Sequence, residues 1–137
     1  MQIDFRPAVF NRYRPADSGR VLIVDTDWLR CDEVVGFIQD LGGFDTQCTR
    51  SAHAALTVAT EFQPGVVLMN TDLSDLDCYQ LASAFQQRAG LCHARLIALT
   101  SEIAAADRQA ALLAGFEQFL TLPLQQTALL RVLTGRS

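Results

Sequence analysis

The residues of this 137-residue chain that could do chemistry are polar side chains placed directly after short apolar runs. Asp25, Thr26 and Asp27 follow one such run, and Asn70 follows a later one. Carboxylates in these positions could hold a divalent cation or act as nucleophiles. Enzyme chemistry is not expected, because no histidine or second general base stands beside Asp25 at the end of a strand.

The elements that must position these residues are predicted from alternating apolar patterns. Runs of strand length alternate with segments whose apolar residues recur at helical spacing, and glycine or proline ends most of those segments. This alternation favours right-handed crossovers and one parallel sheet covered on both faces, which is a doubly wound α/β fold. Five strands are predicted at residues 21–24, 44–49, 66–69, 96–99 and 116–121. Five helices are predicted near residues 28–41, 51–62, 81–85, 103–114 and 124–133.

The carboxyl ends of these strands define the expected functional crevice, because ligands of such folds bind beyond that edge of the sheet. Residues 25–27, 70–72, 100–101 and 121–123 are expected to meet there.

Residues 1–19 are predicted to form an N-terminal extension, and residues 20–137 are predicted to form the folded domain. The extension contains two prolines and shows no periodicity, so it is expected to be extended or loosely packed. The arginines in and next to this extension could bind an anionic ligand such as a nucleotide second messenger, although scattered arginines are usually solvated. They are Arg6, Arg12, Arg14 and Arg20.

Composition narrows the function classes. The formal net charge of −4 argues against direct nucleic-acid binding, which usually needs a basic face. No apolar run approaches the roughly 20 residues of a membrane span. Charged residues interrupt the N-terminal segment, whereas a signal peptide contains a continuous apolar stretch. A cytoplasmic protein is therefore expected. The four cysteines lack Cys-x-x-Cys or zinc spacing, so all are predicted to be reduced, mostly buried thiols, with a metal or redox site as the alternative.

Five segments follow one another along the chain, at residues 21–25, 64–70, 72–78, 96–100 and 119–124. In this order they resemble the response-regulator receiver family across residues 20–135. The resemblance implies a flavodoxin-like (βα)5 receiver fold in bacterial signal transduction. In that family a carboxylate on the third strand accepts a phosphoryl group, and acids after the first strand hold a divalent cation. A lysine after the fifth strand pairs with the phosphoryl oxygens.

The sequence departs from the family at each position that carries this chemistry. Asn70 stands at the acceptor position, and an amide is a far weaker nucleophile than a carboxylate. Thr26 replaces the second acid, and Leu122 replaces the lysine in a chain that has no lysine at all. Mg²⁺ and other cofactors are therefore not expected, and no metal ligands are assigned.

The resemblance and its departures together predict a phosphorylation-independent module that binds a protein partner. Two alternatives remain open. A displaced acid, Asp72 or Asp27, could accept the phosphoryl group instead, or the crevice and the arginines could sense a small ligand such as a nucleotide. Thr100 and Phe119 occupy the family's switch positions, where they either couple the site to a surface or serve as a strand-end hydroxyl and a partly buried aromatic residue.

A surface for association is predicted over the fourth helix, the fifth predicted strand and the fifth helix. Between Gln109 and Leu130 the only charged residue is Glu117, although the outer face of a surface helix is normally charged. If Leu112 packs in the core, the face that stays exposed is apolar and suggests a homodimer. The alternative is that these alanine-rich helices have no role in association. The candidate interface residues are Ala110, Ala111, Leu113 and Leu130.

Overall fold

The computed structural model describes residues 2–4, 19–101 and 108–134 of the chain. The strands are β1 (Gln2–Asp4), β2 (Arg20–Val24), β3 (Asp45–Thr49), β4 (Val66–Asn70), β5 (Arg95–Thr100) and β6 (Phe116–Thr121). The helices are α1 (Trp28–Leu41), α2 (Ala55–Phe62), α3 (Cys78–Gln87), α4 (Arg108–Ala114) and α5 (Gln126–Thr134). No helix within these ranges is long and apolar enough to cross a membrane.

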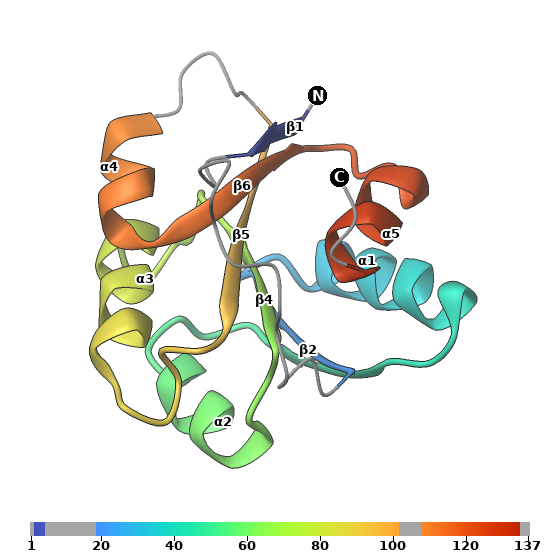
Figure 1. Cartoon of the computed structure of the whole chain (residues 1–137). Coiled ribbons are helices and arrows are strands. Elements are labelled where there is room, and N and C mark those ends of the chain that lie inside the picture. Colours follow the sequence, from blue (N-terminus) through green and yellow to red (C-terminus); the bar gives the residue numbers. More distant parts are fainter. Residues whose placement is uncertain (1, 5–18, 102–107, 135–137) are drawn as a thin grey trace.

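One twisted sheet organises the molecule, in the strand order β1-β6-β5-β4-β2-β3 (Figure 1). The five strands from β2 to β6 are parallel, which confirms the predicted doubly wound α/β fold. β1 is a sixth strand that the sequence analysis did not predict. It pairs antiparallel with the outer edge of β6, with Gln2 opposite Leu120 and Asp4 opposite Gln118. Three residues are too few to show a period, so backbone pairing of this kind leaves no side-chain pattern.

Helices cover both faces of the sheet, as Figure 1 shows. The core on one face includes Phe85 of α3 and Phe116 of β6, and the core on the other face includes Ile38 of α1 and Leu129 of α5. β4 lies between the two cores, and every one of its residues is buried. This explains its unbroken apolar run, because a central parallel strand meets apolar neighbours on both sides.

Local signals set most of the helix boundaries. The side chain of Asp27 caps α1, and Gly42 ends that helix with a positive φ of 74°. α2 begins at Ala55 rather than at the predicted Ser51, whose hydroxyl instead accepts from Ala54 N in the preceding turn. α5 begins at Gln126, two residues later than predicted. Of the predicted helix 103–114, residues 103–107 lie outside the described part.

The prediction of four reduced cysteines is wrong for two of them. Cys31 of α1 and Cys48 of β3 form a disulfide, with their Cα atoms 6.3 Å apart. The two residues are 17 positions apart in sequence, and packing of α1 beside β3 brings them together. No sequence motif marks such a pair. Cys78 is a buried free thiol and Cys92 is an exposed one.

The exposed thiol, the buried thiol and the disulfide are expected to react with an alkylating reagent under different conditions. Burial raises the pKa of the Cys78 thiol to about 12, with a further contribution from the negative charge of Asp77. A thiol with a raised pKa stays protonated, and therefore unreactive, at any pH well below that value. At pH 8, iodoacetamide is expected to modify only Cys92 in the native protein, as measured by intact mass.

Denaturation should add a second modification at Cys78, and reduction under denaturing conditions should add two more at Cys31 and Cys48. The variant Cys92→Ser is the control and should remain unmodified while it is folded. Four modifications in denatured protein without reductant would contradict the disulfide, and rapid labelling of native Cys78 would contradict its burial.

Candidate functional site

The candidate site lies at the carboxyl ends of β2 and β4, where the sequence analysis placed the crevice. Asp25 directly follows β2, and its side chain is fully buried. Its Oδ1 atom accepts from the backbone N–H of Asp27 at 2.9 Å. Its Oδ2 atom accepts from the side-chain amide Nδ2 of Asn70 at 3.1 Å. The structure therefore brings the first predicted acid into direct contact with the amide at the acceptor position.

Arg30 is a central member of this site that the sequence analysis missed. It lies in the first turn of α1, with Nε 2.6 Å from Asp25 Oδ2 and Nη2 3.4 Å from Asp25 Oδ1. Nη2 also lies 3.8 Å from Asp27 Oδ2. The hydrogen bond to Asp25 is the main cause that raises the pKa of Arg30 above its ordinary value, and the charges of Asp25, Asp27 and Asp72 add to it. The guanidinium therefore stays charged at every working pH.

The polar side-chain atoms at the two substituted acid positions form hydrogen bonds between the ends of β2 and β4. Asn70 uses both ends of its amide, since Nδ2 donates to Asp25 and Oδ1 accepts from the backbone N–H of Asp72 at 2.6 Å. Thr26 Oγ1 accepts from the backbone N–H of Ser74 at 3.3 Å. These bonds hold the loops after β2 and β4 against each other.

Three further acids near the crevice serve as backbone caps. Asp27 caps α1, and Asp77 caps α3 by accepting from Tyr79 N at 2.8 Å. Asp75 accepts from Ala52 N at 2.9 Å and so secures the turn before α2. Caps of this kind satisfy the N–H groups that a helix or turn leaves unpaired at its start.

The residues present do not fit a divalent metal ion. Mg²⁺ binds through oxygen atoms, usually with one or two carboxylates free to coordinate it. Here both oxygens of Asp25 already accept hydrogen bonds from the protein, and the Arg30 guanidinium lies against them. Throughout the described ranges, no group of three or more His, Cys, Asp or Glu side chains could hold a metal ion.

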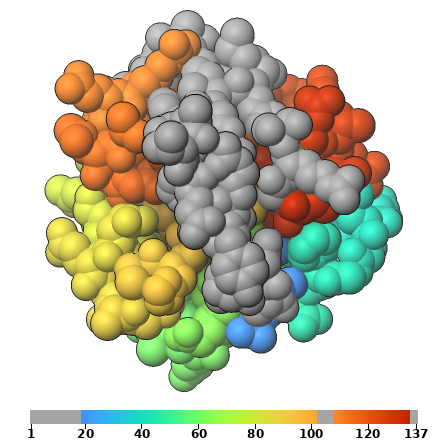
Figure 2. Space-filling view, viewed as in Figure 1, coloured from blue at the N-terminus to red at the C-terminus, as the bar shows by residue number. Residues whose placement is uncertain are grey.

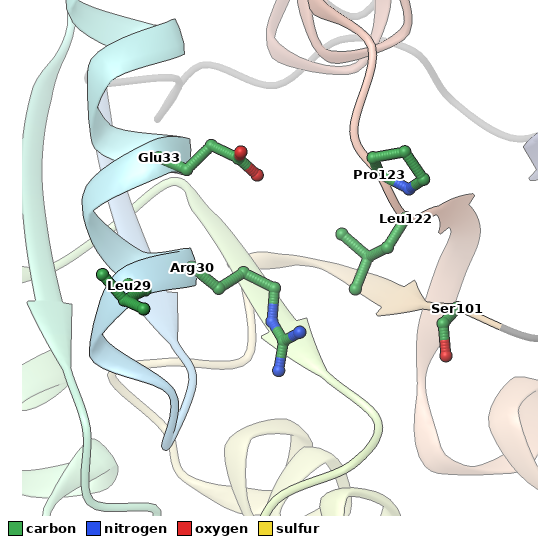
Figure 3. Close-up of a pocket in the computed structure, with 6 residues that line it drawn as sticks. All are labelled: Leu29, Arg30, Glu33, Ser101, Leu122 and Pro123. Atoms are coloured by element: carbon green, nitrogen blue, oxygen red, sulfur yellow. The ribbon is translucent and has the colours of Figure 1, made fainter.

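Leu122, which stands where the family has its lysine, lines a partly apolar pocket of about 370 Å³. Figure 3 shows Leu122 and Pro123 on one side of this pocket and residues of α1, including Arg30, on the other. A leucine offers no hydrogen-bond donor or charge to a phosphoryl oxygen. The residues that line the pocket are Leu29, Arg30, Glu33, Ser101, Leu122 and Pro123.

The two switch positions are both inside the protein. Thr100 ends β5 and is buried, and its carbonyl accepts from Leu122 N at 2.7 Å. Phe119 was predicted to be a partly buried aromatic residue if it has no switch role, but it is fully buried in the core. Its position in the middle of β6 explains this, because helices cover both faces of that part of the sheet (Figure 1).

The predicted interface needs two corrections. Ala111 is fully buried, whereas Leu112, which was assigned to the core, is 52% exposed. The buried residues of α4 are Ala111 and Ala114, which lie three positions apart on one face, so Leu112 and Leu113 point outward. Leu113 is 80% exposed and Leu130 of α5 is 42% exposed, while Ala110 is partly buried. Figure 2 shows α4, in orange, and α5, in red, at the surface on opposite flanks of the view, because the two helices pack on opposite faces of the sheet.

The arginines proposed to bind an anionic ligand are only partly described. Arg6, Arg12 and Arg14 lie outside the described residues. Arg20 donates from Nε to the carbonyl oxygen of Gln63 at 3.0 Å, which is a contact within the fold.

Comparisons with known proteins agree with this architecture. The chain matches the response regulator receiver domain family over residues 21–134, and it therefore belongs to that family. No curated protein matches it.

Several solved structures share the fold at low sequence identity. The chemotaxis response regulator CheY4 of Vibrio cholerae superposes with a TM-score of 0.76 at 20% identity, over 84% of this chain and 95% of that one. The receiver domain of the sensor histidine kinase PA1611 from Pseudomonas aeruginosa, which has a magnesium ion coordinated in its active-site cleft, gives 0.76 at 23%, over 84% and 93%. The receiver domain of Ssk1 from Saccharomyces cerevisiae, in complex with Ypd1, gives 0.73 at 21%, over 84% and 86%.

Proposed function

We propose that this receiver domain accepts no phosphoryl group at the usual position and acts in signalling as a phosphorylation-independent protein-interaction module. The observation that carries the proposal is the contact among Asp25, Arg30 and Asn70. Asp25 and Asn70 occupy positions of the family's chemistry, and the Asp25 carboxylate accepts hydrogen bonds from both Asn70 and Arg30. The protein is then a cytoplasmic binding module rather than an enzyme, and it needs neither Mg²⁺ nor another cofactor.

For each step of phosphoryl acceptance, this chain lacks an available side chain that could perform it. The Asn70 amide offers no carboxylate oxygen to attack phosphorus, and its Oδ1 already accepts a hydrogen bond. Arg30, the cation that the described part of the chain places beside Asp25, is paired with that carboxylate and so is not available to neutralise a transferred group. Leu122 cannot replace the family's lysine. Thr100 and Phe119 then respond to a binding partner instead of a phosphoryl group.

The partner in this proposal is a second copy of the chain, bound through the exposed leucines of α4 and α5. Leu112 and Leu113 of α4 and Leu130 of α5 are exposed large apolar side chains, and Glu117, the one charged residue between Gln109 and Leu130, is buried. Exposed large apolar side chains favour association. The net charge of −4 gives no basic surface for nucleic acid.

Replacing Leu113 with aspartate is expected to convert the dimer to a monomer. The substitution places a charge on the most exposed of the three leucines, where burial against a partner would desolvate it. Sedimentation velocity of the wild type and the variant measures the change. Gln39→Asp, which adds the same charge on an exposed position of α1, is the control and should leave the dimer intact. A wild-type protein that is monomeric at every soluble concentration would rule out the dimer.

A displaced acceptor is the second candidate. Asp72 is exposed at the crevice, and its charge acts on Arg30, so a phosphodonor could reach it. This alternative requires a phosphoryl label that is present in the wild type and absent from Asp72→Asn. Asp27 is a weaker candidate, because its carboxylate caps α1 through Leu29 N and Arg30 N.

A further inference from the structure

The arginine in the crevice has the contacts expected of a bound cation. Nε of Arg30 lies 2.6 Å from one carboxylate oxygen of Asp25, and Nη2 lies 3.4 Å from the other. Nη2 lies 3.8 Å from Asp27 Oδ2, and the charge of Asp72 also acts on the guanidinium. One positive group therefore faces three carboxylates from the loops after β2 and β4.

The fold keeps this positive group in place. Arg30 lies in the first turn of α1, and its backbone N–H donates to Asp27 Oδ1 at 3.4 Å. Only 29% of its side chain is exposed, and the carboxylate of Asp25 that it contacts is fully buried. A guanidinium attached to the chain is present at every metal concentration, whereas a metal ion exchanges with the solvent.

We propose that Arg30 is the resident cation of this crevice and that it excludes divalent metal ions from it. The inference rests on the proposed function, because it concerns the same closed site, but it assigns the closure to one residue. Loss of the acids at Thr26 and Asn70 is then only part of the cause. Restoring both acids adds negative charge around Arg30 and leaves the guanidinium where a metal ion would have to bind.

The test compares two variants of the full chain in which both acids are restored, Thr26→Asp with Asn70→Asp. One variant also carries Arg30→Met, and the control carries Arg131→Met on the exposed surface of α5. The two proteins have the same net charge. Mn²⁺ is the probe, because it binds oxygen ligands and quenches tryptophan emission at short range. Trp28 is the only tryptophan of the chain and lies three residues after Asp25, so its fluorescence reports binding at this site.

Mn²⁺ is expected to bind at least about tenfold more tightly to the Arg30→Met variant than to the control, because a like charge a few ångströms away is removed. Equal affinity in the two variants would overturn the inference, whether both bind or neither binds. If the Arg30→Met variant is only marginally folded, the rise in melting temperature on addition of Mn²⁺ gives the same comparison. Phosphoryl acceptance by the wild type would overturn the proposed function without affecting this result, so the two failures are distinguishable.

Discussion

Replacing Asp25 with alanine is expected to lower the free energy of unfolding by about 2–4 kcal/mol, since each buried donor left without its acceptor costs about 1–3 kcal/mol. The carboxylate is fully buried and accepts from the Asp27 backbone, the Arg30 guanidinium and the Asn70 amide. Asn70 is itself buried, so its amide cannot turn to water when Asp25 is removed. Urea unfolding monitored by circular dichroism measures the change.

The sign of this effect distinguishes a closed site from an open metal site. In an open site, neighbouring acids repel one another without a cation, and removal of one acid would stabilise the protein. The cycle of Asp25→Ala, Arg30→Ala and the double variant should show a favourable coupling between the two residues. A more stable Asp25→Ala protein would contradict the geometry described for Arg30.

Replacing Glu117 with alanine is expected to destabilise the protein by about 3–5 kcal/mol, because it leaves a buried arginine without its counter-ion. Arg95 Nε lies 3.1 Å from Glu117 Oε2, and the two side chains are 3% and 9% exposed. Arg95 Nη1 donates to the carbonyl oxygen of Val132 at 2.7 Å, so the pair ties β5, β6 and α5 together.

A matched double variant provides the control. Arg95→Met with Glu117→Leu replaces both charges by apolar groups of similar size, and such replacements are often neutral or stabilising. The double variant should therefore be more stable than Glu117→Ala in the same urea titration. A Glu117→Ala protein of wild-type stability would show that the pair contributes nothing.

The sheet itself could be predicted because its signals lie in single segments. Four apolar residues of β4 in a row mark a strand buried on both faces, and Asp27 and Gly42 mark the ends of α1. The strand β1 and the bond between Cys31 and Cys48 could not be predicted, because both depend on which distant segments become neighbours. No local pattern encodes that choice.

The candidate site could be predicted only in part. Asp25, Thr26 and Asn70 were found because strand ends in a parallel sheet meet at one edge. Arg30 was missed because its role depends on the direction of a long side chain. One local signal was available: Arg30 lies three positions after the cap residue Asp27, in the first turn of α1, which starts beside Asp25.

The leucines of α4 show a further limit. Leu112 was assigned to the core because large apolar residues are usually buried. In the structure α4 packs through Ala111 and Ala114, whose small side chains allow the helix to approach its neighbours closely. Helical period alone could not choose between these two faces, because both contain apolar residues.

The central claim is that the site is chemically silent, and labelling with a small phosphodonor tests it most directly. The protein is incubated with Mg²⁺ and acetyl phosphate, with a receiver domain that accepts phosphoryl groups treated in parallel, and both intact masses are measured. We predict that the parallel receiver gains one phosphoryl group and that this chain gains none. A stoichiometric phosphoryl group on the wild-type chain would contradict the account, and its loss in Asp72→Asn would establish the displaced acceptor.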